Sequence, residues 1–506
     1  MRHTLTYQAL ALEGVVSNVP SRQTVSAVLD RAAASYIDAE ALVDGEVRLT
    51  WLELRSAVRD AARALAGMGV LPGDRVALCA PNSAQWVVAA LGALHAGAAL
   101  VPINTRFTAT ETLDVVRRSA ARVLVVEGEF LGRDREEELR ALSPELPAVV
   151  RLPASWVASE VDLPALSEDQ LCDVMYTSGT TGRSKGAMSA HRQSLGVAEA
   201  WASCGELTAA DRYLIVNPFF HTFGYKAGIL ACLLTGAAIV PQPVFDVVET
   251  MRLIERERIT VLPGPPTIFQ ALLDHPERAS FDLSSLRLAV TGAAVVPVVL
   301  IERMRAELSL TVLTAYGLTE AVVATMCRPG DSPETVAHTC GAPTAGFELR
   351  LGAQDEVLLR GPNVMLGYLD DPGATAAAID ADGWLHTGDV GKIDERGYLS
   401  ITDRLKDMYI CGGFNVYPAE IEQALARLPG VAESAVVGMT DARLGEVGVA
   451  HIVLGAGSSL TADEVIAFCR SFLANYKVPR AVEFHPSLPR NAMGKVLKTQ
   501  LRKENA

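Results

Sequence analysis

Short apolar runs and amphipathic stretches alternate along the first quarter of the chain. The apolar runs Arg75–Ala80, Ala98–Ile103 and Arg122–Glu127 have the length of strands, and Ser83–His95 has the length of a helix. A further helix is predicted to begin after Thr50, because the sequence Thr-Trp-Leu-Glu has the spacing of a capping box. Strands that alternate with helices in this way predict a parallel sheet with helices on its faces.

The same alternation resumes between residues 191 and 312, where the strands end in a characteristic kind of sequence. Four apolar runs are each followed by a stretch rich in glycine, proline or polar residues. These stretches are Phe219–Tyr225, Pro263–Pro266, Thr291–Ala294 and Thr314–Glu320. In open α/β sheets, ligands bind beyond the carboxyl ends of the strands. The four stretches are therefore predicted to form the wall of a binding site.

The pattern changes twice toward the C-terminus. Short strands and glycine turns over residues 339–401 predict a small β-barrel-like subdomain, and a unit with α+β patterns follows it. The predicted fold class is α/β and β. A large N-terminal domain of two helix-flanked β-sheets and the β subdomain is expected over residues 1–403, and a small α+β C-terminal domain over residues 404–506.

The stretch Tyr176–Gly186 holds three glycines and several side chains that can meet an anion. Glycine lets the backbone approach a ligand closely, and successive N–H groups can then form an anion-binding concavity. Hydroxyls add donors and a cation adds charge, here from Ser178, Thr180, Thr181, Ser184 and Lys185. The spacing does not fit a Walker A loop. The stretch predicts a different polyphosphate-binding loop, and the alternative is a surface turn rich in glycine, serine and threonine.

Composition narrows the function classes. The 506 residues are 49% apolar and 21% charged, as in ordinary soluble enzymes, and the net charge of −14 argues against a nucleic-acid partner. The eight cysteines contain no C-x-x-C pair, so neither zinc nor a disulfide framework is indicated and a cytoplasmic location is expected. No secretion signal is visible. The nearly uncharged segment Trp86–Ile103 is broken at Gly97 and predicts a buried helix and strand, so no integral membrane association is expected.

The loop Tyr176–Gly186 and four later motifs resemble those of the acyl-adenylate-forming (ANL) superfamily. The later motifs are Tyr316–Glu320, Thr387–Asp389, Asp403–Lys406 and Asn491–Lys495. They stand in the family's order, and the resemblance covers essentially the whole chain. The family includes acyl-CoA synthetases, luciferases and the adenylation domains of peptide synthetases.

The resemblance implies two half-reactions with ATP, Mg²⁺ and CoA. A carboxylate attacks the α-phosphate of ATP to give acyl-AMP and pyrophosphate; the mobile small domain then turns, and the thiol of CoA takes the acyl group. In-line attack at phosphorus needs alignment and charge neutralisation more than a general base. The residues implied to hold the nucleotide are Thr177, Ser178, Gly179, Thr180, Thr181, Gly182, Lys185, Gly292, Ala293, Ala294, Tyr316, Gly317, Asp389 and Arg404.

Four residues are implied to act at the reacting atoms. Glu320 is the implied Mg²⁺ ligand, because this hard cation prefers carboxylate oxygens, and Thr319 contacts the α-phosphate. Lys495 enters the site only during adenylation, where it bridges the carboxylate and the α-phosphate. His221 lies beside the reacting carboxylate, and a packed aromatic cap is its structural alternative.

The family resemblance also implies roles in the second half-reaction for one residue and one short stretch. Lys406 matches the family's hinge, which absorbs the backbone change when the small domain turns. Gly412, Gly413 and Phe414 resemble the stretch that lines the tunnel for the pantetheine arm of CoA. Glycines at such a place permit the close approach of a narrow thiol arm.

The stretch Phe219–Tyr225 limits the choice of acid. Adenylation domains for amino acids place an aspartate near this strand end, and no acidic residue occurs here, so the implied substrate lacks an α-ammonium group. The implied acyl pocket is apolar and aromatic and favours a hydrophobic acid over malonate; it consists of Phe220, Phe223, Tyr225, Pro265, Ala315 and Val322. Lys226 either caps a helix face or meets a polar group of the substrate. No carrier domain follows Ala506, so diffusible CoA is the expected acceptor.

Within the family, three stretches resemble the actinobacterial synthetases that activate HIP, the methylated indanedione propanoate left from the C and D rings of steroids. These are Asn217–Gly236, Thr260–Pro276 and Thr402–Glu422. Ala321–Met326 is less similar and can reshape the pocket. Medium-chain fatty acids and aryl acids are alternative substrates, and a luciferase-like oxygenase or a non-catalytic ligand-binding remnant are alternatives from other classes. The expected partners are a small carboxylic acid and CoA, and a homodimer is left open.

Overall fold

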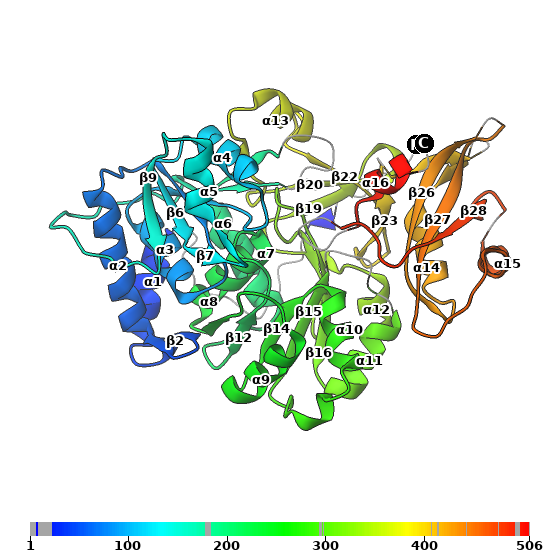
Figure 1. The fold of residues 1–506 in the computed structure, drawn as a ribbon, viewed down its shortest axis with the longest axis horizontal. Coiled ribbons are helices and arrows are strands. Elements are labelled where there is room, and N and C mark those ends of the chain that lie inside the picture. The colour runs from blue at the N-terminus through cyan, green and yellow to red at the C-terminus, as the bar shows by residue number, and fades with distance from the viewer. Residues whose placement is uncertain are drawn as a thin grey trace.

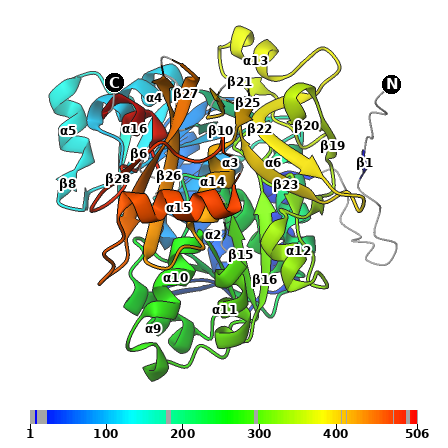
Figure 2. The ribbon, with the colours of Figure 1, turned by 90° about the vertical axis from the view of Figure 1, so that its right-hand side faces the viewer.

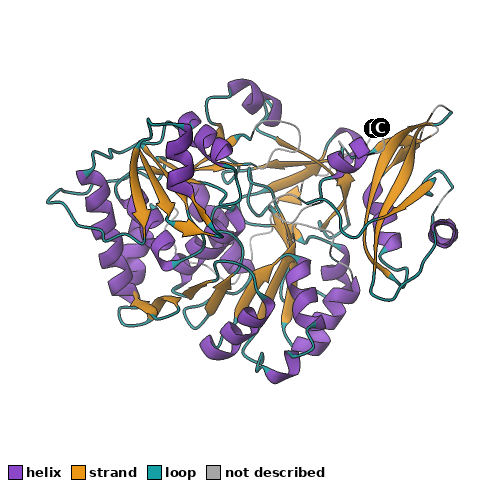
Figure 3. Cartoon of the chain, in the orientation of Figure 1, coloured by secondary structure: helices purple, strands orange, loops and turns teal. Residues whose placement is uncertain are grey.

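The computed structural model of the protein describes residues 7–8, 23–177, 184–292, 296, 298–405, 407–411, 414–441, 443–473, 475–490 and 496–504. Figure 1 shows a large N-terminal part and a smaller C-terminal domain beside it. Strands lie inside both parts and helices cover them (Figure 3). The predicted fold class is confirmed.

Seven strands of the described ranges form the first sheet, in the order β21-β11-β10-β5-β4-β6-β9. The five strands from β10 to β9 are parallel, whereas β11 and β21 join antiparallel at one edge. The strands are β4 (Arg75–Cys79), β5 (Ala99–Pro102), β6 (Val123–Glu127), β9 (Ala148–Leu152), β10 (Leu171–Tyr176), β11 (Gly186–Ala190) and β21 (Gly367–Tyr368).

The second sheet contains nine described strands in the order β18-β17-β16-β15-β14-β12-β13-β2-β3, and its central strands are parallel. Of the four stretches predicted to form a site wall, Phe219–Tyr225 follows β12, and the other three begin within the last residues of β14, β15 and β16. The strands are β2 (Glu40–Asp44), β3 (Val47–Thr50), β12 (Arg212–Ile215), β13 (Ala238–Pro241), β14 (Val261–Gly264), β15 (Leu288–Gly292), β16 (Thr311–Tyr316), β17 (Thr325–Met326) and β18 (Ala342–Pro343).

Helix α3 (Ala84–His95) lies between these two sheets and contacts β2, β4 and β5. All of its residues except Gln85 are buried, which explains its uncharged sequence. In the part of the chain that the structure describes, no helix has the length and apolarity to cross a membrane. The other helices around the sheets are α1 (Val25–Ser35), α2 (Trp51–Gly67), α4 (Ala109–Arg118), α5 (Arg135–Leu142), α6 (His191–Cys204), α7 (Thr222–Gly224), α8 (Ala231–Thr235), α9 (Val247–Glu257), α10 (Pro266–Asp274), α11 (Val298–Leu308), α12 (Pro333–His338) and α13 (Pro372–Ala378).

The predicted β subdomain is a mainly antiparallel sheet in the order β1-β19-β20-β22-β23 among the described residues. Its last strand leads directly toward the C-terminal domain. The strands are β1 (Tyr7–Gln8), β19 (Glu348–Leu351), β20 (Glu356–Arg360), β22 (Leu385–Ile393) and β23 (Leu399–Arg404).

The C-terminal domain is α+β, as predicted. A sheet of β25, β24, β27, β26 and β28 carries α14 and α15 on one face, and Figure 2 shows α15 running across it. The elements are β24 (Tyr409–Cys411), β25 (Phe414–Val416), α14 (Pro418–Leu425), β26 (Val431–Asp441), β27 (Gly445–Leu454), α15 (Ala462–Phe472), β28 (Ala481–Phe484) and α16 (Lys498–Glu504).

A buried ion pair ties the first sheet to the segment after β12. Lys226, in the π-helix Tyr225–Leu230, lies 2.8 Å from Asp173 Oδ1 of β10, and both side chains are at most 1% exposed. Lys226 Nζ also donates to Ser189 Oγ at 2.9 Å, and Ser194 Oγ donates to Asp173 Oδ2 at 2.6 Å. Lys226 is therefore an internal cation rather than a cap on an exposed helix face.

We expect Lys226→Met to destabilise the protein by about 3–5 kcal/mol, because it leaves the Asp173 carboxylate buried without its cation. Urea unfolding measures the loss. The double variant Lys226→Met/Asp173→Leu should be more stable than Lys226→Met alone, since no charge remains buried. A double variant that loses as much stability as the two single variants together would contradict this account.

Candidate active site

The Asp389 carboxylate is the centre of a polar cluster at the carboxyl end of the second sheet. Tyr316, the last residue of β16, donates from its hydroxyl to Asp389 Oδ2 at 2.6 Å. Arg404 Nε, at the end of β23, lies 2.8 Å from Asp389 Oδ1. The Asp389 side chain is 4% exposed, so its charge is held by these two donors rather than by bulk water. Each carboxylate oxygen can accept a second hydrogen bond, so the group can also receive two hydroxyls of a ligand.

The Tyr316 hydroxyl is held in its protonated form. Burial raises the pKa of Tyr316 well above its usual value, and the neighbouring Asp389 charge raises it further. The phenol therefore remains a donor to Asp389 at any working pH. Its ring stays at the end of β16, and Tyr316 is one of the residues that the family resemblance implies hold the nucleotide.

Glu320, Tyr368 and Lys185 form a second polar group close to this strand end. Tyr368 of β21 donates from its hydroxyl to Glu320 Oε1 at 2.6 Å, and the Lys185 ammonium lies 5.0 Å from the centre of the Tyr368 ring. Burial and the Glu320 charge raise the pKa of Tyr368, so this phenol is also a permanent donor. Sequence reasoning missed Tyr368, which stands almost two hundred residues from Lys185.

The Glu320 carboxylate fits the expected magnesium ion. Mg²⁺ is commonly bound by one or two carboxylates together with substrate phosphates and water. Only Glu320 Oε1 receives the Tyr368 hydroxyl, so the second oxygen can serve as a ligand. A cation there would lie near Lys185, where phosphates are expected.

The two ends of the predicted phosphate loop are held together. The Thr177 N–H donates to Lys185 O at 2.8 Å, and the Lys185 N–H donates to Thr177 Oγ1 at 3.4 Å. Arg118 Nη1 donates to Ser184 O at 2.7 Å. These contacts bring the end of β10 close to the start of β11, with Lys185 directly before β11.

Several predicted site residues lie outside the described residues: Ser178, Gly179, Thr180, Thr181, Gly182, Ala293, Ala294, Lys406, Gly412, Gly413 and Lys495. Phe414 lies in β25, and only its backbone is among the described parts of the structure. Gly292 is described, and a Cβ added there would lie 2.6 Å from Ala315 O. Glycine at this position therefore allows β15 to end close to β16.

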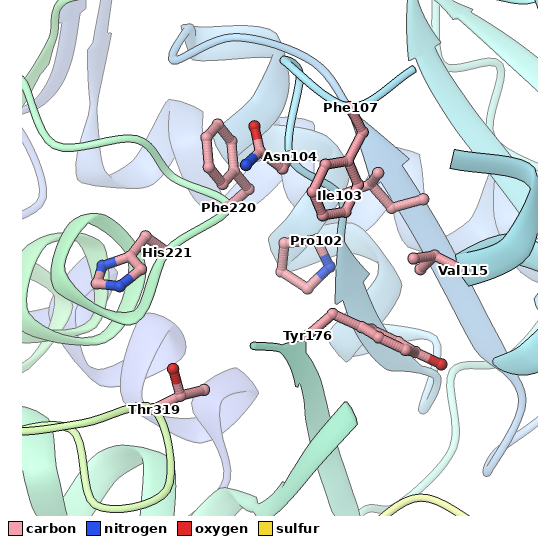
Figure 4. Close-up of a pocket in the computed structure, with 9 residues that line it drawn as sticks. All are labelled: Pro102, Ile103, Asn104, Phe107, Val115, Tyr176, Phe220, His221 and Thr319. Carbon is pink, nitrogen blue, oxygen red and sulfur yellow. The ribbon is translucent and has the colours of Figure 1, made fainter. Parts of the chain in front are cut away.

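A cavity lies between the ends of β5 and β10 and the loops that carry His221 and Thr319 (Figure 4). It contains three predicted residues: Phe220, His221 and Thr319. Among its other lining residues, Tyr176 begins the predicted phosphate loop, and Pro102 and Ile103 end a strand that the sequence did predict, but none of the three was predicted to line a cavity. The full lining is Pro102, Ile103, Asn104, Phe107, Val115, Tyr176, Phe220, His221 and Thr319.

His221 is a neutral imidazole in this cavity. Its Nδ1 accepts from the Phe223 N–H at 3.3 Å, so the proton of the neutral ring belongs on Nε2. Loss of hydration lowers the pKa of His221 to about 4. The ring can therefore donate a hydrogen bond from Nε2 without adding a positive charge.

The other predicted pocket residues are not among those that line this cavity. Tyr225 is fully buried, packs against Trp86 and has its hydroxyl 3.8 Å from Cys172 Sγ. Phe223 packs edge-on against Trp201, with ring centres 5.2 Å apart. Pro265 caps the start of α10, and Ala315 and Val322 flank the Tyr316–Glu320 loop.

Comparison with known proteins identifies the class. The AMP-binding enzyme family matches residues 29–369, and the AMP-binding enzyme C-terminal domain matches residues 420–495. The chain therefore belongs to the AMP-binding enzyme family, whose members form adenylates.

Two relatives share more than half of their residues with the chain. A 3-[(3aS,4S,7aS)-7a-methyl-1,5-dioxo-octahydro-1H-inden-4-yl]propanoyl:CoA ligase of Rhodococcus jostii (strain RHA1) is 58% identical, over 95% of this chain and 98% of the relative. The protein of the same name from Mycobacterium tuberculosis (strain ATCC 25618 / H37Rv) is 59% identical, with the same coverage. Among solved structures, an anthranilate CoA ligase in complex with anthranoyl-AMP superimposes with a TM-score of 0.88 at 28% identity, covering 96% of this chain and 98% of that one.

We expect Gly317→Ala to lower the rate of acid-dependent pyrophosphate release by about 100-fold, the effect of a displacement of about 1 Å at a reacting centre. A Cβ at this position would lie 1.8 Å from Val322 O, so the Tyr316–Glu320 loop must shift. Gly330→Ala is the matched control, because a Cβ there meets no atom within 4 Å. Equal rates for the two variants would show that the loop tolerates the shift.

Proposed function

We propose that this chain is an ATP-dependent acyl-CoA ligase that activates HIP, the indanedione propanoate named in the two relatives. The observation that carries this proposal is their identity of 58% and 59% across nearly the whole of each chain. The polar clusters around Asp389 and Glu320 support the same chemistry, because they supply acceptors for a ribose and a ligand for a metal ion.

The residues divide the work of adenylation. Asp389 receives the ribose hydroxyls, with Arg404 and Tyr316 fixing its carboxylate. Lys185 and the loop 178–183 hold the β and γ phosphates, and Thr319 meets the α-phosphate. Glu320 would hold Mg²⁺, and the ion would supply neutralisation of charge on the phosphates. Alignment of the carboxylate with the α-phosphate is then the main remaining requirement.

The C-terminal domain, which we begin at residue 404, contributes to each half-reaction in turn. Lys495 supplies a positive charge between the carboxylate and the α-phosphate during adenylation. A rotation at Lys406 then replaces it with the Gly412–Phe414 segment, beside which the thiol of CoA reaches the acyl group. All eight cysteines are free thiols, which supports a reducing cytoplasm as the place of action.

The cavity beside His221 suits the propanoate end of an apolar acid. Ile103, Phe107 and Phe220 offer apolar walls, and the neutral His221 can donate to the carboxylate from Nε2. A neutral donor orients the carboxylate nucleophile. It stabilises the negative charge of the carboxylate less than an ammonium would, so the carboxylate keeps more of its nucleophilicity. Medium-chain fatty acids and aryl acids would bind the same walls but have no bicyclic diketone to recognise.

Pyrophosphate release with HIP, octanoate and ferulate, each with and without CoA, tests the proposal. We expect kcat/KM for HIP to exceed the other values by at least about tenfold, the scale of discrimination that pocket shape supplies. The product with CoA should be the thioester. Preference for octanoate or ferulate would move the substrate to another class, and turnover that consumes O₂ without CoA would indicate an oxygenase.

We expect Lys495→Ala to lower the adenylation rate by about 100-fold or more, as the loss of one charge-stabilising donor does. Thioester formation from supplied acyl-AMP should remain near the normal rate, because Lys495 has left the site in that step. Stopped-flow or quenched assays of the two half-reactions measure this, with the exposed Lys392→Ala as control. An equal loss in both half-reactions would contradict the assignment.

A further inference from the structure

Two histidines and a carboxylate meet on the sheet of the C-terminal domain. His451 stands in β27, Glu483 in β28, and His485 directly follows β28. The two strands are parallel neighbours with His451 opposite Glu483, and the His485 N–H donates to Ile452 O at 2.9 Å. Because side chains alternate along a strand, Glu483 and His485 point to the same face of the sheet.

The three ligand atoms converge on one point. His451 Nδ1 lies 2.9 Å from His485 Nε2 and 3.4 Å from Glu483 Oε2, and His485 Nε2 lies 3.8 Å from that oxygen. A tetrahedral zinc ion lies about 2.0–2.2 Å from nitrogen or carboxylate oxygen, which sets its ligand atoms roughly 3.3–3.6 Å apart. The three observed separations span this range, so small side-chain rotations suffice to surround an ion.

We propose that His451, Glu483 and His485 form a binding site for a divalent transition metal of the zinc type, with water as the fourth ligand. Imidazole nitrogens with a single carboxylate suit zinc, whereas Mg²⁺ and Ca²⁺ prefer sets of oxygen ligands. The His451 side chain is fully buried and fixed within β27. Glu483 and His485 are 38% and 21% exposed, which leaves a path for the ion from solvent.

The competing state is a hydrogen bond between the two imidazoles. At 2.9 Å the two nitrogens share one proton when both rings are neutral. A metal ion must displace that proton, so binding releases it and becomes weaker in acid.

A metal ion at this site would connect β27 to the chain segment that follows His485. The same face of the sheet carries Val449, which packs with Leu488 and Leu501. Beyond Leu488, Arg490 forms an antiparallel bridge with Val496, and the Lys495 motif stands between these two residues in the sequence. An ion bound to His451 and His485 would fasten to β27 the chain that leads from His485 to Arg490.

Metal titration of the untagged, chelator-treated full-length protein tests the site. We expect one equivalent of Co²⁺ to give the visible absorption of a tetrahedral complex, and Zn²⁺ to displace it. Zn²⁺ should also raise Tm, as any ligand of the folded state does. His485→Asn and Glu483→Gln should each weaken Zn²⁺ binding by at least about tenfold, since even the loss of an outer-shell partner commonly has that effect.

His386→Asn is the matched control, because His386 also lies beside two carboxylates, 2.9 Å from Glu356 and 3.6 Å from Asp380. This substitution should leave Zn²⁺ binding unchanged. The partly exposed ligands are chosen because replacement of the buried His451 could unfold the sheet. The proposal is overturned if the unsubstituted protein binds no stoichiometric Co²⁺ or Zn²⁺. It is equally overturned if both ligand variants bind as tightly as that protein does.

Discussion

The buried Asp389 carboxylate holds together the parts of the chain that meet at the candidate active site. A carboxylate removed from water must be paired and hydrogen-bonded, because otherwise its ionised form is strongly disfavoured. Asp389 meets this requirement through Tyr316 and Arg404, which end β16 and β23. One charge therefore fixes the second sheet against the β subdomain, at the point where the chain passes to the C-terminal domain.

The same rule operates at Glu320, where the donor comes from a third part of the fold. Tyr368 belongs to the edge strand of the first sheet, yet its hydroxyl meets a carboxylate that follows β16. In both clusters a phenol of raised pKa donates to a carboxylate. The acceptors are thus oriented before any ligand arrives, which is the preorganisation that phosphoryl chemistry requires.

A third carboxylate links this site to the smaller domain. Asp403 accepts from the Arg404 N–H at 2.7 Å and from the Ala419 N–H of α14 at 3.0 Å. Burial raises the pKa of Asp403 to about 6, although both hydrogen bonds and nearby Lys498 oppose the shift. The residue that ties α14 to β23 therefore stands next to Arg404, which contacts Asp389. The candidate active site and the C-terminal domain are joined through two adjacent residues, Asp403 and Arg404.

The sequence by itself determined the helices and strands, the fold class and the positions of the candidate site loops. These depend on local patterns: the capping box of Thr50 and Glu53 is present, and the predicted site loops follow the ends of parallel strands. Only the tertiary structure decided which side chains pair: Lys226 with Asp173, Tyr368 with Glu320, and His451 with Glu483 and His485. It also placed the cavity wall at the end of β5 and Tyr225 in the core. Local periodicity fixes which face of a strand is buried, but a contact between distant residues depends on sheet order, register and packing.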